Sequence, residues 1–462
     1  MEKINYRREI KTEEGYDVVV AGGGPAGTAA AVSAARLGAK VLLVEAFGCL
    51  GGTATSGLVL YLQPISNGIL LCGGIAKETV DALVVNGWAS HIKDLKEWNA
   101  AGCPGGFGFD SEGLKLILDG MVSKAGVETR FYTTVIDADV DASSKTVNGV
   151  VISNVEGQTY IKAKKFIDAT GDAVLSDLCG AAYYEAGRDT PNIMPPTLCA
   201  VAGGVNWSDV YDDRSGLRGQ QEKIEQAIAD GFFSQPDRHV PGLIENQGPL
   251  GLMNCGHVFK MNSVNIRSLS DGMKKGRRLV QEYADFYRKY LGINRLQVIT
   301  TASMMGIRES RRIKGEYTLN YDDYRARQQF PDQIGIFSYP VDIHVYDCTP
   351  SEYARYYEEF NKMDRYKSGE CYGIPYGILV PKGWNNLWVA GRCASSDVKV
   401  QGSLRVQPAA YLMGEAAGTA AVQAMKTGKA ANAIDTAVLV ETLRKQGAIL
   451  PQKTTVNGLT QN

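Results

Sequence analysis

The sequence lacks several features that would assign it to large classes of proteins. No two of its nine cysteines form a C-x-x-C pair, which argues against a zinc ribbon or an iron–sulfur cluster, and we predict no metal site. No hydrophobic run approaches the ~20 residues that a membrane span needs. No hydrophobic segment follows the polar start Met1–Arg8, so we predict neither a signal peptide nor a membrane anchor.

The chain also lacks an excess of charge of either sign. It carries 49 Lys and Arg residues against 50 Asp and Glu residues, a formal net charge of −1. Without a long-range field we expect no nucleic-acid partner and no membrane partner. The scattered cysteines suit a reducing compartment. We therefore expect a cytoplasmic protein that acts on a small molecule, and a homo-oligomer is compatible with the sequence.

Glycine, by contrast, is abundant, with 52 residues, and one cluster joins two apolar runs. Tyr16–Ala21 predicts a buried parallel strand, and Gly22–Gly27 follows it directly. A helix is expected over Pro25–Leu37, with Gly38 at its C-terminal cap, and Lys40–Ala46 predicts a second buried strand. This strand–helix–strand unit has the length of a βαβ crossover.

Within this unit, the spacing of the glycines is that of a dinucleotide-binding turn. Gly22 permits the turn, Gly24 lets the backbone approach a pyrophosphate, and Gly27 lets the helix pack closely on the strand. Glu45 ends the second strand, where a carboxylate accepts hydrogen bonds from ribose hydroxyls and repels a 2′-phosphate. Pro25 and Ala26 at the helix start and Ala46 after Glu45 complete the predicted contacts of the unit.

The remaining elements predict an α/β fold: a discontinuous Rossmann-type domain with an inserted α+β substrate domain. We expect residues 1–200 to form the first part, residues 201–375 the substrate or cap domain, and residues 376–462 the return. The first part divides into the βαβ unit 16–46, a glycine-rich loop 47–108, a helix 111–125 and a β-meander 127–167. The return holds a strand at 387–390, a helix at 404–425 and a helix at 435–446.

Three further segments favour FAD over NAD. Gly48–Gly57 follows Glu45 where a loop crosses the flavin diphosphate, and Phe166–Asp172 resembles the second flavin motif of two-dinucleotide-domain flavoproteins. Leu387–Arg405 leads into a long helix, as in the segment of that superfamily that passes the ribitol and the pyrimidine edge. The additional residues expected to contact FAD are Gly51, Gly52, Thr53, Val135, Ala169, Thr170, Gly171, Gly391, Arg392, Gly402, Ser403 and Leu404.

Taken together, the chain resembles the bacterial FAD-dependent oxidoreductase family, distant kin of the fumarate-reductase and glutathione-reductase flavoproteins. The matching stretches are Val18–Thr55, Gly73–Ile75, Gly306–Arg312, Val341–His344, Ile374–Tyr376 and Asn386–Gly418. The resemblance implies the fold and an FAD cofactor. It does not imply a substrate.

Residues missing from these motifs narrow the reaction. Disulfide reductases of the superfamily have C-x-x-x-x-C after Gly-Gly-Thr, whereas Ala54 and Val59 stand at those two positions here, which argues against thiol–disulfide exchange. No second G-x-G-x-x-G follows a strand in mid-chain, so a separate NAD(P)H domain is not expected. The electron donor or acceptor is therefore left open.

The candidate acid–base residue is one of only four histidines. His344 is our first choice, because in an extended segment Asp342 and His344 project from one face, and a carboxylate orients an imidazole and raises its pKa. A purely structural His–Asp pair is the other interpretation. His257, near Asn254 and Cys255, is the alternative base.

A charged run supplies the candidate anion-binding residues. Arg308 and Arg311 belong to the sequence Arg308-Glu309-Ser310-Arg311-Arg312, and either arginine could hold a substrate carboxylate or a pair of hydroxyls. The other interpretation is an Arg–Glu–Arg network that fastens two domains. Arg392 and Arg405 lie in the segment near the flavin and could stabilise charge at the pyrimidine ring.

These residues suit an FAD-dependent oxidoreductase that dehydrogenates a small polar substrate, a sugar-like alcohol or a hydroxy acid, by hydride transfer to flavin N5. The reverse direction is reduction of an activated alkene, as in fumarate reductases, with Arg308 or Arg311 supplying the proton. A third alternative is an FAD-binding subunit that relays electrons between partners and has no organic substrate of its own.

Overall fold

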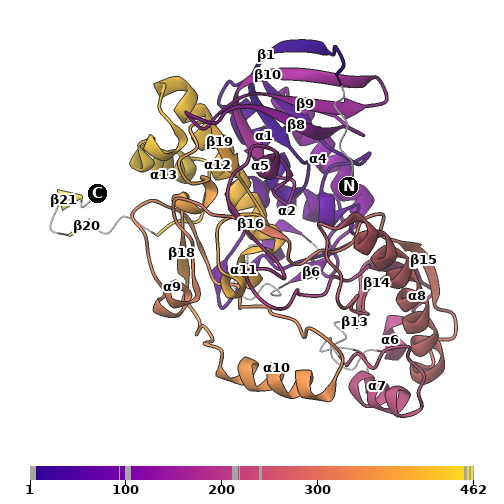
Figure 1. Cartoon of the computed structure of the whole chain (residues 1–462). Helices are drawn as coiled ribbons and strands as arrows, with labels where there is room; N and C mark the ends of the chain where they lie inside the picture. Colours follow the sequence, from indigo (N-terminus) through magenta and orange to yellow (C-terminus); the bar gives the residue numbers. More distant parts are fainter. Residues whose placement is uncertain are drawn as a thin grey trace.

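The computed structural model contains a seven-stranded sheet in the order β7-β2-β1-β10-β9-β8, with β19 also paired to β10; its strands β1, β10, β9 and β8 lie at the top of Figure 1. The structure describes residues 7–92, 94–98, 106–210, 217, 219–238, 242–451, 455–456 and 459–460. The strands of this sheet are β1 (Lys11–Ala21), β2 (Val41–Val44), β7 (Glu128–Arg130), β8 (Thr134–Asp141), β9 (Thr146–Asn154), β10 (Gly157–Asp168) and β19 (Leu387–Val389).

Strand β10 joins the two parts of this sheet. One edge pairs in parallel with β1. The other edge pairs antiparallel with β9 at its start and parallel with β19 at its end. Strands β2 and β7 extend the parallel part on the far side of β1. Because β19 comes from much later in the chain, the predicted discontinuous α/β fold is confirmed, and the carboxyl ends of five parallel strands meet at one edge.

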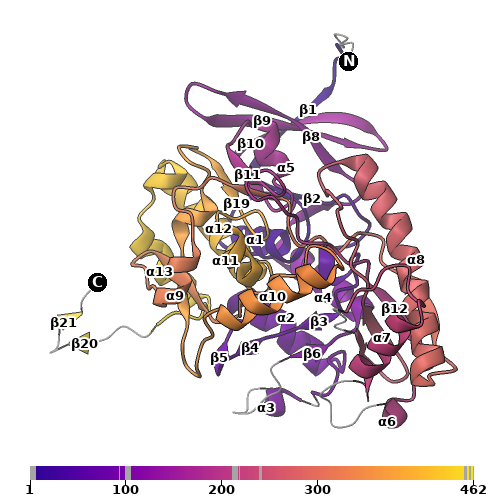
Figure 2. The same cartoon turned by 60° about the horizontal axis from the view of Figure 1, so that its bottom comes forward.

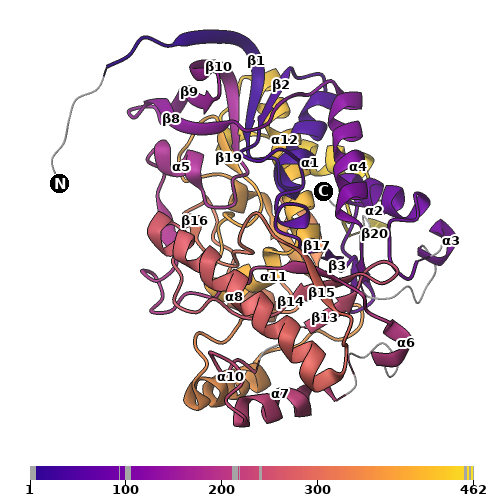
Figure 3. The same ribbon diagram turned by 90° about the vertical axis from the view of Figure 1, so that its right-hand side faces the viewer.

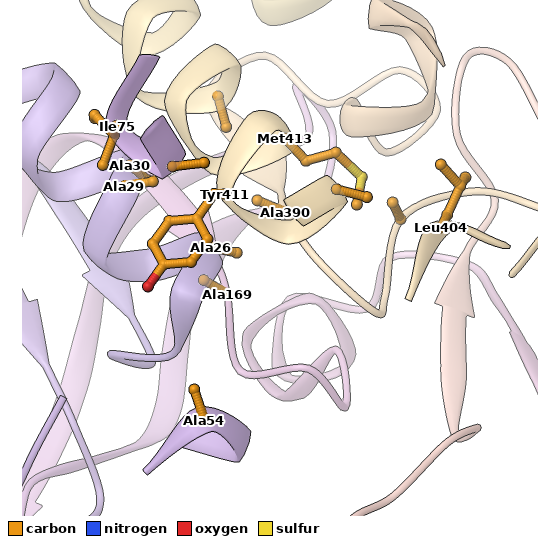
Figure 4. Close-up of a cluster of buried hydrophobic side chains, with 14 of the residues drawn as sticks. Ala26, Ala29, Ala30, Ala54, Ile75, Ala169, Ala390, Leu404, Tyr411 and Met413 are labelled. Atoms are coloured by element: carbon orange, nitrogen blue, oxygen red, sulfur yellow. The ribbon is translucent and has the colours of Figure 1, made fainter. Parts of the chain in front are cut away.

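Helices α1 (Pro25–Arg36) and α12 (Gln407–Thr427) pack against each other at very short range. A Cβ added to Gly414 would lie 2.0 Å from the carbonyl oxygen of Ala26, and one on Gly418 would lie 2.2 Å from that of Ala30. The Ser33 and Thr419 hydroxyls are 2.8 Å apart across the same contact. Figure 4 shows the small side chains of α1 facing α12. Small residues at one-turn spacing thus fix the position of α1 and of the turn before it.

Several further helices, small sheets and single turns lie outside the seven-stranded sheet. The helices are α2 (Gly74–Val85), α3 (Leu95–Trp98), α4 (Ser111–Ala125), α5 (Val174–Leu178), α9 (Tyr321–Ala326), α11 (Val398–Leu404) and α13 (Thr436–Lys445). The two-stranded sheets pair β3 (Tyr61–Leu62) with β6 (Phe107–Gly108), β4 (Ile65–Ser66) with β5 (Ile69–Leu70), β11 (Tyr183–Glu185) with β16 (Arg311–Ile313), β17 (Gln333–Phe337) with β18 (Tyr372–Pro375), and β20 (Thr455–Val456) with β21 (Leu459–Thr460). Single turns of 3-10 helix are η1 (Gly52–Ala54), η2 (Tyr376–Leu379) and η3 (Ala431–Ala433).

A second, antiparallel sheet has its own hydrophobic core. Its strands, in the order β13-β14-β12-β15, are β12 (Ala200–Gly203), β13 (Gly242–Glu245), β14 (Gly251–Asn254) and β15 (Gln297–Thr301). The long helix α8 (Ile266–Leu291) lies across this sheet (Figure 3). It buries Tyr283 and Tyr287, one turn apart on the same face, with Met253 in one cluster. Helices α6 (Trp207–Val210) and α7 (Gln220–Ala229) pack at its edge.

Helix α10 (Pro350–Lys362) lies between the C-terminal helices and the α7–α8 region (Figure 2). The Tyr353 hydroxyl on α10 donates a hydrogen bond to Asp237, in the loop after α7. Residues 334–374 belong to the predicted cap domain, but they contribute to the main hydrophobic core with α12. The domain limits proposed at 200/201 and 375/376 stay predictions. In the described part of the chain, no helix is long and apolar enough to span a membrane.

Two expectations for local structure were wrong. The helix predicted over 404–425 begins only at Gln407, as α12, and a separate short helix, α11, ends at Leu404, because Pro408 in the first turn of α12 cannot extend a helix from Leu404. The first strand predicted for the meander, from Val127, is instead split: β7 pairs in parallel with β2 at the sheet edge, and only β8 continues into the antiparallel part.

Candidate active site

The turn between β1 and α1 has the backbone geometry that its glycines predict. Gly22 has φ +95°, and a Cβ there would lie 2.6 Å from the carbonyl oxygen of Ala169. A Cβ on Gly27 would lie 1.7 Å from the carbonyl oxygen of Gly22, so only glycine allows this closeness of helix and strand. Gly24, the N-terminal cap of α1, has open space on its Cβ side. The first N–H groups of α1 are thus accessible to an anion.

A cavity of about 320 Å³, here called the first cavity, opens at the carboxyl ends of the parallel strands. Its walls come from the β1–α1 turn, the ends of β2, β10 and β19, and the start of α12. This is where ligands bind in open α/β sheets. Of the residues that the sequence predicts for the cofactor, the following line it: Gly22, Gly24, Pro25, Ala26, Glu45, Ala46, Gly52, Thr53, Val135, Ala169, Thr170, Gly171, Gly391 and Arg392.

The other five predicted residues do not line this cavity. Gly27 and Gly51 support it from behind: Gly51 has φ +103°, and its N–H donates to the carbonyl oxygen of Gly23 over 2.8 Å. The remaining three residues, Gly402, Ser403 and Leu404, are buried in α11.

The residues of α11 hold a neighbouring segment rather than the cavity itself. A Cβ on Gly402 would lie 2.9 Å from the main-chain oxygen of Asp342, and the Ser403 hydroxyl donates to the carbonyl oxygen of Tyr339 over 2.6 Å. The motif that resembles a cofactor contact therefore positions the segment that carries Asp342 and His344.

Glu45 is buried at the end of β2, with its carboxylate toward the turn. Its two oxygens accept hydrogen bonds from the Gly23 N–H at 2.5 Å and the Phe47 N–H at 2.8 Å. Burial raises the pKa of Glu45, and these backbone hydrogen bonds oppose that effect. A carboxylate oxygen has a further lone pair, which fits the predicted contact with a ribose hydroxyl.

Several residues of the first cavity were not predicted from the sequence. These are Phe47, Thr133, Thr134, Asp172, Val174, Met304, Ile307, Gln407 and Ala410. Thr133 follows the parallel strand β7, and its N–H donates to the carbonyl oxygen of Glu45 over 2.9 Å. A parallel strand at β7 would have predicted that Thr133 lies beside Glu45. For Gln407, the signal in the sequence is Pro408, which is typical of the first turn of a helix.

The composition of the first cavity fits the expected FAD. Its walls are glycine- and alanine-rich backbone, and Gly24 leaves a space that any other side chain would fill. The side-chain nitrogen of Gln407 donates a hydrogen bond to the carbonyl oxygen of Val59 over 2.8 Å. The side-chain oxygen of Gln407 is buried without a hydrogen-bond partner. A buried acceptor of this kind requires a donor, which a bound polar ring would supply.

A second cavity of about 460 Å³ adjoins the first. Four residues line both, namely Thr53, Ile307, Arg405 and Gln407. The second cavity also contains Arg308, Asp342 and His344. The structure thus brings two of the three predicted catalytic residues together, next to the predicted cofactor site.

His344 and its neighbours form a charged group at this cavity. The Asp342 Oδ1 atom lies 3.4 Å from His344 Nε2, and Asp342 Oδ2 accepts a hydrogen bond from Arg405 Nη2 at 2.8 Å. Burial and the positive charge of Arg308 lower the pKa of His344 well below its usual range, which outweighs the opposite effect of Asp342. Asp342 thus raises the pKa of His344 as expected, but the net shift is downward because the imidazole is only 4% exposed.

Arg308 is buried in the same wall. Its Nη1 atom donates to the carbonyl oxygen of Pro195 at 2.6 Å and to the Thr197 hydroxyl at 3.0 Å. Burial, together with the charge of Arg405, lowers the pKa of Arg308 to about 10. The guanidinium thus remains charged near neutral pH and keeps further N–H donors for a ligand.

Arg311 lies elsewhere. On β16 it forms an ion pair with Asp177 at 3.0 Å and lies over the ring of Tyr183, and it lines neither cavity. Arg312 pairs with Glu309 and Asp189. Arg311 and Arg312 are thus held by separate ion pairs, in which Arg308 takes no part, and the fastening of two domains stays a prediction.

The remaining candidates are distributed as follows. His257 is buried behind His344, with their ring nitrogens 2.9 Å apart. His91 lies 3.3 Å from Glu245, and His239 falls outside the described residues.

Ala54 lies in η1 and Val59 lines the second cavity, so no dithiol stands at these positions. Among the described residues, no group of ligands could hold a metal ion.

Comparisons with curated proteins cover parts of this chain. It is 29% identical to a mitochondrial dihydrolipoyl dehydrogenase of Schizosaccharomyces pombe over 245 residues, 50% of this chain and 44% of that protein. It is 45% identical to a vinyl phenol reductase of Lactiplantibacillus plantarum over 94 residues, 19% of this chain and 18% of that protein. The chain thus matches less than half the length of either relative.

A solved structure and a family model cover most of the chain. A p-nitrophenol 4-monooxygenase from Pseudomonas putida superposes with a TM-score of 0.48 and 14% identity, over 94% of this chain and 84% of that one. The family model described as FAD dependent oxidoreductase matches residues 17–445. Because this match spans both cavities, the chain belongs to the FAD dependent oxidoreductase family.

Proposed function

We propose that this FAD-dependent oxidoreductase dehydrogenates a small hydroxy acid, or a sugar-like alcohol, in the second cavity. The observation that carries the proposal is the position of His344: a buried imidazole beside Asp342, in a cavity that shares part of its wall with the first cavity. The first cavity would hold FAD, whose flavin accepts a hydride when it is bound. The second cavity would hold the substrate.

Within this proposal, His344 removes the proton from the substrate hydroxyl. Its lowered pKa keeps the imidazole neutral near pH 7, and therefore able to accept a proton. Asp342 stabilises the imidazolium that results, and Arg405 in turn keeps Asp342 ionised. Burial raises the pKa of Asp342, but the protonated form of His344 and the guanidinium groups of Arg405 and Arg308 hold it well below its usual range.

Charge in the second cavity favours an acid over a neutral sugar. Its lining carries two guanidinium groups, on Arg308 and Arg405, against one carboxylate, on Asp342. With His344 neutral, the lining has a net positive charge, which a substrate carboxylate would balance. Arg308 can supply the paired N–H donors that bind a carboxylate.

An anaerobic absorbance titration tests this proposal. Purified protein with FAD bound is titrated with 2-hydroxy acids, sugars, polyols and amino acids, and bleaching of the oxidised flavin band is followed. We expect a hydroxy acid to bleach the flavin in the wild type and in Arg311→Gln, but at least about 100-fold more slowly in His344→Ala. FAD content should be equal in all three. Equal bleaching rates in the wild type and His344→Ala would refute the role of His344.

A second candidate reaction is the reduction of an activated alkene. It is favoured by the buried Arg308, whose pKa of about 10 suits a proton donor better than an ordinary arginine does, and by the partial likeness to a vinyl phenol reductase. For this reaction, chemically reduced protein should be reoxidised anaerobically by an enoate or a vinyl phenol, and Arg308→Lys should slow that step. If neither titration changes the flavin spectrum, the electron-relay alternative is favoured.

A further inference from the structure

A chain of buried acid–base groups continues from His344 into the protein. His344 Nδ1 lies 2.9 Å from His257 Nε2, and His257 Nδ1 lies 3.0 Å from Asp237 Oδ2. The Tyr353 hydroxyl donates to Asp237 Oδ1 over 2.7 Å. His257 is 1% exposed and Asp237 is 0% exposed. His257 and Asp237 thus extend the described site by two residues, and neither of them lines the first or the second cavity.

Three separate segments form this chain. Asp237 lies in the loop between α7 and β13, His257 in the loop after β14, and His344 in the loop between β17 and α10. The main chain fixes the middle of the chain twice: the His257 N–H donates to Asp237 Oδ2 at 2.9 Å, and the Gln235 amide donates to the His257 carbonyl oxygen at 2.6 Å. The two imidazole rings are perpendicular, at 85°, and their facing nitrogens are His257 Nε2 and His344 Nδ1, 2.9 Å apart.

Counting protons shows what this chain can hold. Three gaps separate the carboxylates of Asp237 and Asp342: 3.0 Å, 2.9 Å and 3.4 Å. A hydrogen bond formed across each gap would need one proton, and neither carboxylate would supply one, because the neighbours of both lower their pKa values. Two neutral imidazoles carry one N–H proton each, which is enough for two of the three gaps. A third proton fills the last gap and gives the pair of imidazoles one positive charge. The pair therefore has one place for an additional proton, between two negative charges.

The widest gap is the one at the second cavity. When the pair is neutral, protons across the two shorter gaps leave Nε2 of His344 as the basic nitrogen, next to Asp342. A proton taken up there can be compensated when His344 passes its Nδ1 proton to His257 Nε2. His257 then carries the positive charge, against the carboxylate of Asp237 at 3.0 Å.

We propose that His257 and Asp237 form a proton store behind His344, which takes the substrate proton out of the second cavity and returns it in the reverse reaction. The proton balance is closed: one O–H bond of the substrate breaks, one N–H bond forms at His344 Nε2, and one proton moves from His344 Nδ1 to His257 Nε2. His344 is thereby neutral again while the product is still bound. This inference rests on the proposed function for its use in catalysis, but the shared proton can be tested without a substrate.

The groups that face the store define its electrostatics. The cations Arg308 and Arg405 line the second cavity, and Asp342, paired with Arg405, lies 3.4 Å from His344. On the other side, Tyr353 of α10 donates to the Asp237 side chain, and Tyr283 of α8 donates to its main-chain oxygen over 3.4 Å. Burial raises the pKa of Tyr283 well above its usual range, so this hydroxyl stays neutral.

The first test uses the small number of histidines. The four imidazoles are labelled with ¹⁵N in the FAD-bound protein, and their nitrogen shifts are followed by NMR from pH 5 to 9. We expect His257 and His344 to take up one proton in a single shared transition, and Asp237→Asn to move the transition of both. Separate transitions, with His344 unaffected in Asp237→Asn, would overturn the proposal.

The second test measures proton movement during reduction. The rate of anaerobic bleaching by the most effective hydroxy acid is compared in H₂O and D₂O. We expect Asp237→Asn to lower this rate at least about tenfold and to increase the solvent isotope effect, whereas the matched control Asp230→Asn, at an exposed aspartate hydrogen-bonded to Tyr290, keeps both values. An unchanged isotope effect in Asp237→Asn overturns the relay while the proposed function stands. If no compound bleaches any of the proteins, the proposed function fails and the NMR comparison alone decides the store.

Discussion

Replacing Glu415 by glutamine should change how the stability of the protein depends on pH. Glu415 lies on α12 with only 5% of its surface exposed, and its Oε2 atom accepts a hydrogen bond from the Ile75 N–H in the first turn of α2 at 3.1 Å. A Cβ on Gly74 would lie 2.1 Å from the same oxygen. Burial raises the pKa of Glu415 from 4.5 to about 7, more than the Ile75 hydrogen bond lowers it.

The direction of the effect follows from proton binding. The folded protein holds a proton on Glu415 up to about pH 7, whereas the unfolded chain releases it near pH 4.5. The contribution of this group to stability is therefore complete below pH 4.5 and is lost as the pH rises toward 7. At about 1.4 kcal/mol per pKa unit, the difference corresponds to about 3 kcal/mol. Glutamine keeps an oxygen for the Ile75 N–H and does not ionise.

Urea unfolding of the wild type and Glu415→Gln, with FAD in excess, measures this effect at several values from pH 5 to pH 8. We expect the two proteins to be similar at the low end, and the variant to be more stable by up to about 3 kcal/mol at the high end. Glu112→Gln, which removes an exposed carboxylate on α4, serves as the control for loss of charge. If the difference between wild type and Glu415→Gln is the same at both ends, Glu415 titrates as an ordinary glutamate and the reasoning fails.

Three further substitutions test the cavities and the helix contact. Gly24→Val should fold but lose FAD, measured by absorbance after gel filtration, because its side chain enters the first cavity; retained FAD would contradict this. Gly414→Ala should lower the free energy of unfolding by about 1–3 kcal/mol, whereas Gly120→Ala, with open space at its Cβ, should not lower it. Gly402→Ala should keep FAD but slow bleaching, since its Cβ displaces Asp342; an unchanged rate would show that this displacement does not matter.

Local patterns were enough to predict the elements at the start of the chain. Val18–Ala21 and Val41–Val44 are uninterrupted apolar runs at either side of a glycine turn and a helix, and β1, β2 and α1 form there. Helix α4 begins and ends at the predicted residues because Asp110 caps its start and Gly126, in the left-handed conformation, ends it. In such segments, the interactions that decide the structure lie within a few residues of one another.

Contacts between distant segments could not be predicted in this way. Asp237, His257 and His344 come from three loops that only the folded chain brings together, and Asp237 shows no pattern that distinguishes it from other aspartates in the sequence. Similarly, the sequence indicates that Asp342 and His344 share a face, but not that burial is strong enough to lower the pKa of His344. Burial depends on elements that the pattern of one segment does not contain.

The break between α11 and α12 explains why two residues of one short segment, Arg405 and Gln407, line both cavities. Leu404 ends α11, and Gln407 and Pro408 begin α12, so the chain between them turns Arg405 toward Asp342 and Gln407 toward the wall that the cavities share. A continuous helix would place these side chains about 200° apart around its axis, and they could not both face the cavities. Pro408 therefore places Arg405 at the acid–base site and Gln407 at the predicted cofactor site. Because both residues adjoin the start of α12, a change in the position of α12 should affect FAD binding and the pKa of His344 together.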